Sequence, residues 1–93
     1  MAMKISKEGV DITDRFFRVL GILIDTGQFT GIKPFCEKYN IKHPNLFHVR
    51  KFPENSVLKP EYLNILVKNY NVSAHWLLTG EGPMFDNSTQ KKE

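Results

Sequence analysis

Two short amphipathic segments joined by only three residues constrain the fold of this chain more than any other feature of its sequence. Residues 32–39 and 43–51 each place apolar side chains at helical spacing, and residues 40–42 are all that separates them. A connection of this length forces two helices to cross steeply. The packing of the two segments against each other is therefore the first thing that the sequence has to satisfy.

Four local requirements of such a steep crossing are met in register. A small residue is needed in the middle of the first segment, and Cys36 is small. The connection needs a residue that tolerates positive φ, which Asn40 does, and an apolar residue such as Ile41 to close the corner. The second segment needs two buried residues three apart, and Leu46 and Val49 have that spacing. The stretch therefore predicts a helix-turn-helix.

Caps and breakers divide the rest of the chain into three further helices, with predicted spans of about 11–26, 60–70 and 73–79. Gly21 lies inside the first of these helices and suggests that another backbone passes close to it. The predicted caps and stops are Asp11 or Thr13 and Gly27 for the first helix, and Ser73 and Gly80 for the last.

No strand-like alternation of apolar and polar residues interrupts these helices, so the predicted class is all-α. One five-helix domain is expected over residues 11–85, preceded by a flexible stretch at 1–10 and followed by a disordered tail at 86–93. The residues expected in its core are Phe16, Leu20, Phe35, Cys36, Leu46, Val49, Leu63, Leu66, Trp76 and Leu77.

Composition argues against several functional classes. The single cysteine rules out an intramolecular disulfide and an all-cysteine metal site. His43 and His48 are poorly spaced to share one ion on a helix, and His75 belongs to another helix, so no metal is expected. No side chains are spaced as a catalytic group, so we expect neither an enzyme nor a cofactor. With no signal peptide and no run near ~18–20 apolar residues, the chain is expected in the cytoplasm, without a membrane partner.

Basic residues are concentrated in the middle of the chain. Between residues 33 and 68 there are seven Lys and Arg side chains against three Glu side chains. This bias favours a polyanionic partner, because phosphate contacts release counterions, although a solvated lysine-rich surface stays the alternative. The residues expected to contact DNA phosphates are Lys33, Lys42, Arg50, Lys51 and Lys59.

The helix predicted at 43–51 has two different faces. If Leu46 and Val49 point inward, the outer face carries histidine, proline, phenylalanine and lysine side chains. Histidine can donate to guanine N7 or O6, and phenylalanine can touch a thymine methyl group. The residues expected to contact DNA bases are His43, Pro44, Phe47 and His48.

Two stretches, FCEKYNIKHPNLFHV and YNVSAHWLLTGEGPMF, resemble the helix-turn-helix domain of phage repressors and Cro proteins, the XRE-like family. The resemblance covers about Asp11 to Phe85. It implies a repressor-like fold, binding to double-stranded operator DNA and regulation of transcription, with repression as the expected effect. By position, it places His43, Pro44 and His48 where such repressors contact bases. The chain departs from the family pattern at Cys36 and at Asn40, where Ala and Gly are usual.

The resemblance also implies a homodimer. The apolar residues left over from the core form the expected interface, at Leu78, Met84 and Phe85, with the outer line of the first helix, Phe17 and Ile24, as a further candidate. A second interpretation stays open: the same fold can serve as a protein-interaction module, such as an antitoxin bound to a toxin partner.

Overall fold

The computed structural model describes residues 4–85, and these residues form an all-α arrangement with one isolated antiparallel bridge between Val72 and Phe85. The chain divides into two compact units, the first ending at Leu58 and the second beginning at Lys59, within what the sequence predicts as one domain. The expected tail at 86–93 lies outside the described residues. The helices are α1 (Lys7–Asp25), α2 (Ile32–Lys38), α3 (His43–Lys51), α4 (Pro60–Tyr70) and α5 (Ala74–Thr79).

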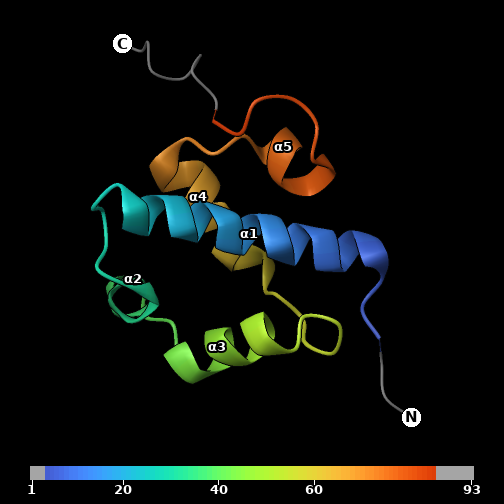
Figure 1. Ribbon diagram of the computed structural model, residues 1–93, viewed down its shortest axis with the longest axis horizontal. Helices are drawn as coiled ribbons and strands as arrows, with labels where there is room; N and C mark the ends of the chain where they lie inside the picture. The colour runs from blue at the N-terminus through green and yellow to red at the C-terminus, as the bar shows by residue number, and fades with distance from the viewer. Residues whose placement is uncertain (1–3, 86–93) are drawn as a thin grey trace. The chain divides into compact units, whose positions relative to one another are not determined.

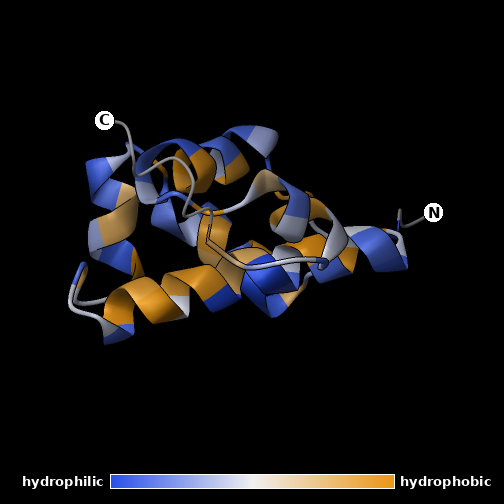
Figure 2. Cartoon of the chain, turned by 90° about the horizontal axis from the view of Figure 1, so that it is seen from above, coloured by the Kyte–Doolittle hydropathy of each residue, from blue (hydrophilic) through white to orange (hydrophobic). Residues whose placement is uncertain are grey.

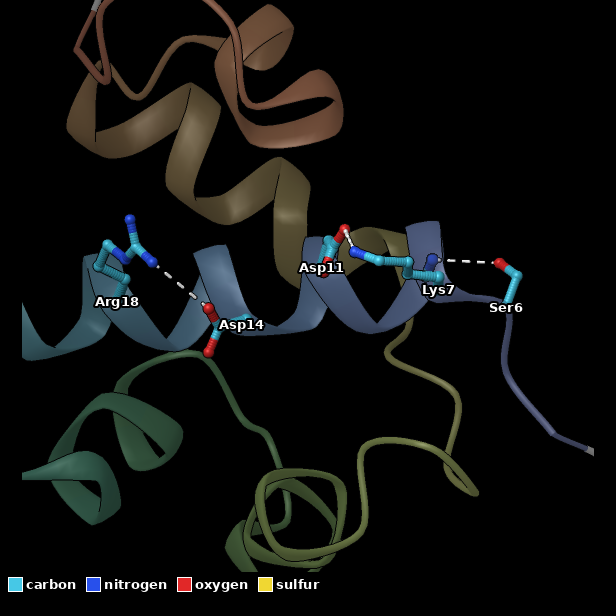
Figure 3. Close-up of polar contacts among 6 residues, drawn as sticks. Ser6, Lys7, Asp11, Asp14 and Arg18 are labelled. Carbon is cyan, nitrogen blue, oxygen red and sulfur yellow. Dashed lines mark hydrogen bonds and ion pairs between the residues drawn. The ribbon is translucent and has the colours of Figure 1, made fainter.

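Helix α1 begins earlier than the sequence predicts. Its N-cap is Ser6, whose hydroxyl accepts a hydrogen bond from the Gly9 N–H at 3.1 Å. Neither Asp11 nor Thr13 caps the helix, because both lie inside it: Asp11 pairs with Lys7 at 3.2 Å, and Thr13 donates to the Gly9 carbonyl at 3.1 Å. Figure 3 shows the cap and the first exposed ion pair of this helix. The prediction failed because the first turn is polar and carries no apolar period.

The first unit is built around an aromatic core. Phe16 of α1 and Phe35 of α2 are almost completely buried, with ring centroids 6.4 Å apart in an edge-to-face arrangement. Phe29, in the connection between the two helices, adds a second edge-to-face contact to Phe35 at 5.4 Å. Such pairs contribute about 0.5–1.5 kcal/mol each beyond the burial of their area. In this unit α3 packs on both α1 and α2, and Figure 1 shows α2 and α3 on one side of α1.

The connection between α2 and α3 has the conformation that its sequence predicts. Asn40 adopts a left-handed φ of 58°, and the Ile41 N–H donates to the Cys36 carbonyl at 2.8 Å. The Asn40 N–H donates to the Glu37 carbonyl at 3.4 Å, which completes a Schellman motif. In Figure 1, α2 is seen nearly end-on while α3 runs across the view, so the chain turns sharply between them. Cys36 is buried at this crossing, as a small residue has to be.

The second unit contains α4 and α5. Ser73 caps α5 by accepting a hydrogen bond from the Trp76 N–H at 3.2 Å, and Gly80 ends it with a left-handed φ of 81°. Leu66, Trp76 and Leu77 are buried as predicted. Leu63, however, is only half-buried, and Tyr62 and Val72 are buried in its place.

None of the described helices combines the length and the apolar character needed to cross a lipid bilayer.

Candidate nucleic-acid interface

Helix α3 buries one side and exposes the other. Leu46 and Val49 are buried, which is the inward pair that the sequence predicts. The opposite side, called here the α3 outer face, consists of four exposed residues: Pro44, Phe47, His48 and Lys51. Since the nine residues of α3 include no acid and three basic side chains in the last turn, this face is suited to an anionic partner.

Aromatic and imidazole rings are paired along this helix. The His43 and Phe47 rings meet edge-to-face at 5.8 Å, and the His48 and Phe52 rings lie 5.1 Å apart. The Lys51 ammonium lies 5.7 Å from the centroid of the Phe52 ring. These contacts restrict the rotamers of exposed side chains, so the outer face meets a partner with less rotamer entropy left to lose.

The predicted base-contacting residues are not equivalent. Phe47 is 40% exposed, and Pro44 and His48 are exposed as well. His43 is half-buried, and its Nδ1 is inaccessible to solvent and makes no hydrogen bond within the described part of the chain. A hydrogen bond from His43 to a base edge is therefore left to Nε2.

The predicted phosphate-contacting residues fall into two groups. Lys42, Arg50 and Lys51 are exposed on α3 or at its N-cap, and Lys33 is exposed in the first turn of α2. Lys59 is the N-cap residue of α4 and belongs to the second unit. The structure thus brings four of the five cations onto the α2–α3 pair.

Two exposed residues of this region did not enter the predicted site. Asn45 is exposed in the first turn of α3, and asparagine can hydrogen-bond adenine N6 and N7 through both of its amide groups. Its residue type could have identified it. Phe52, 43% exposed, follows the last residue of α3 and was assigned to a loop. Its ring joins the outer face through His48, a contact that only the structure reveals.

The predicted dimer residues differ in their surroundings. Leu78 is 51% exposed, beside a groove of about 300 Å³ whose lining includes Leu63 and Val67. Met84 and Phe85 are half-buried and contact their own unit: the Ser73 N–H donates to the Met84 carbonyl at 2.8 Å, and Phe85 forms the bridge with Val72.

Metal-binding and nucleophilic chemistry receive no support from the geometry. Over residues 4–85, no three side chains of His, Cys, Asp or Glu come together to hold a metal ion. Burial, and secondarily the Glu37 carboxylate, raises the pKa of the Cys36 thiol above its ordinary value. A buried thiol with a raised pKa is a poor nucleophile, which fits its place as a small packing residue.

In comparisons with known proteins, no family model, curated sequence or solved structure matched this chain significantly. Its function is therefore inferred from its own residues and their geometry.

Proposed function

We propose that this chain is a sequence-specific DNA-binding regulator of transcription, of the phage-repressor type, in which α2 and α3 act as a helix-turn-helix. One observation carries the proposal: α3 buries Leu46 and Val49 and presents on the opposite side a cationic, imidazole-bearing and partly apolar face without an acid. Such a face matches the major groove, which offers phosphate oxygens at its edges and hydrogen-bond acceptors and thymine methyl groups on its floor.

Each exposed group has a role in this proposal. Asn45 and His48, with Nε2 of His43, read base edges, and Phe47 contacts a thymine methyl group. The cations hold the backbone and set the register of the helix without carrying sequence information. The phosphate-contacting set is Lys33, Lys42, Arg50 and Lys51, with Lys59 as a fifth member from the second unit. A protein with this role acts on cytoplasmic DNA.

A single small domain covers too few base pairs to define a unique site, so the proposed working unit is a two-fold homodimer. Exposed Leu78 and the neighbouring apolar groove of α4 and α5 form a surface on which a protruding side chain lies beside a hollow. This is what a self-complementary interface requires. Met84 and Phe85 support that surface through their backbone contacts with residues 72–73. Two α3 helices about 34 Å apart then enter successive major grooves.

The proposal is tested by selecting duplexes from a random DNA pool with purified protein and measuring affinity for the selected site by fluorescence anisotropy across a salt series. We expect log affinity to fall against log salt with a slope of roughly −4 to −6, through counterion release. Lys51→Ala should flatten the slope by about one unit and leave the preferred sequence unchanged. Lys68→Ala removes the same charge from an exposed position on α4 and serves as the matched control. A pool that yields no enriched sequence, or an affinity independent of salt, contradicts the proposal.

A further inference from the structure

Gly21 occupies a position in α1 that the chain itself does not explain. It lies inside the helix with an ordinary helical backbone, and a Cβ added there would meet no atom within 4 Å. The predicted close approach of another backbone of this chain is therefore wrong for the described residues. Glycine weakens a helix interior, so its use at an open position indicates that the space above it is needed by something outside the chain.

The open space above Gly21 belongs to a groove of about 290 Å³ within the first unit. Phe17, Gly21 and Ile24 of α1 form one wall, and the other lining residues include Ile32 of α2 and Phe47 and Arg50 of α3. We call this the α1–α3 groove. Figure 2 shows that the second half of α1 is hydrophobic along most of its length, while its first turn is hydrophilic. This half of the helix therefore supplies apolar surface beyond what the core uses.

Arg50 is the charged residue of the lining, and it gives the groove an electrostatic preference. Its side chain is exposed, and none of the ion pairs among the described residues involves it. A guanidinium beside apolar surface pairs best with a carboxylate, which it can bind through two parallel hydrogen bonds. The groove thus asks for apolar groups and an acidic group at a short distance from one another.

We propose that the α1–α3 groove docks a helix of a partner protein that presents apolar side chains at i and i+4 and a carboxylate to Arg50. A helix suits an open groove between helices, because residues three and four apart emerge on one side of it. Gly21 suits a helix in particular, since the missing side chain lets the partner backbone approach α1 closely. This inference goes beyond DNA binding and needs no DNA for its test.

The experiment selects binders from a phage-displayed library of random peptides on the purified wild-type protein. The strongest peptide is then synthesised, and its affinity is measured by fluorescence anisotropy. We expect the selected sequences to share apolar residues at i and i+4 flanked by Asp or Glu. Addition of the peptide should shift the NMR amide signals of α1 and α3 around Gly21 and Arg50, and leave those of α4 and α5 in place.

Two variants locate the site. Gly21→Leu fills the groove from a position where a side chain meets no atom of the chain, and it should weaken the peptide at least tenfold. Arg50→Gln should weaken it about five- to tenfold, whereas Arg18→Gln removes an arginine that does not line the groove and should leave affinity unchanged. If Gly21→Leu does not melt like wild type, Phe47→Ala replaces it, because Phe47 is exposed and lines the same groove.

Several results would overturn the proposal. These are a selection without binders, a peptide that binds Gly21→Leu or Phe47→Ala as tightly as wild type, and selected sequences that lack an acid and ignore Arg50→Gln. Sedimentation of the free protein covers the remaining occupant. A wild-type dimer that Gly21→Leu converts to a monomer would assign the groove to a second copy of this chain and refute a separate partner.

Discussion

Replacing Gly21 by alanine should stabilise this protein, although the residue lies in the interior of its longest helix. Alanine exceeds glycine by about 0.5–1 kcal/mol in a helix interior, because glycine loses more backbone entropy on folding. The added methyl group meets no atom within 4 Å, so neither a clash nor a packing gain changes this value. For a domain of this size, a change of about 0.5–1 kcal/mol corresponds to a rise in Tm of about 2–8 °C.

Gly27 provides the matched control. A Cβ there also meets nothing within 4 Å, but the residue has a φ of +89° at the end of α1. It sits in a Schellman motif, in which the Gln28 N–H donates to the Leu23 carbonyl at 2.8 Å and fixes the left-handed conformation. Alanine in that conformation is strained by about 1–2 kcal/mol, so Gly27→Ala should destabilise the protein. The two variants add the same atom to equally open space and differ in backbone conformation.

Urea unfolding followed by far-ultraviolet circular dichroism measures both free energies on one scale, and thermal melting provides the second readout. The expected result is opposite signs for the two variants. A loss of stability in Gly21→Ala would mean that something fills the space above Gly21. This outcome would remove the basis for an open α1–α3 groove. If Gly27→Ala left stability unchanged, the backbone argument itself would be wrong.

Three further predictions concern the other parts of the molecule. Trp76→Ala should lower the free energy of unfolding by about 3–5 kcal/mol, since the ring is buried, while Leu78→Ala at an exposed site should change it by less than about 1 kcal/mol; urea titrations of both variants check this. Leu78→Asp should convert the proposed dimer to a monomer in sedimentation while its circular dichroism stays that of wild type, and a dimer that persists would contradict the α4–α5 interface. Because burial raises the pKa of Cys36 above its ordinary value of 9.0, folding favours the neutral thiol; the contribution is complete below that pH and is lost as pH rises past it. Unfolding titrations should show this loss, and Cys36→Ala should lack it.

The sequence by itself determined the features of this protein that act over a few residues. The bounds of α3 and α4 agree with the predicted spans, because Pro44 and Pro60 mark their first turns and polar or glycine-free breakers follow them. The left-handed conformation of Asn40 was predictable, since few residues tolerate it. The outer face of α3 followed from the spacing of Leu46 and Val49, which fixes which side of a helix points inward.

Only the tertiary structure decided what depends on residues far apart in the chain. Helix periodicity places Tyr62 and Leu63 on the same apolar side of α4, and the packing of that helix buries the first and leaves the second half-exposed. Phe47 and Arg50 are residues of an exposed face when α3 is considered alone. They become the wall of a groove because α1 lies beside them with no side chain at Gly21. A pattern along one helix records which side is apolar, but the depth of burial and the hollows between helices depend on the neighbours that the fold supplies.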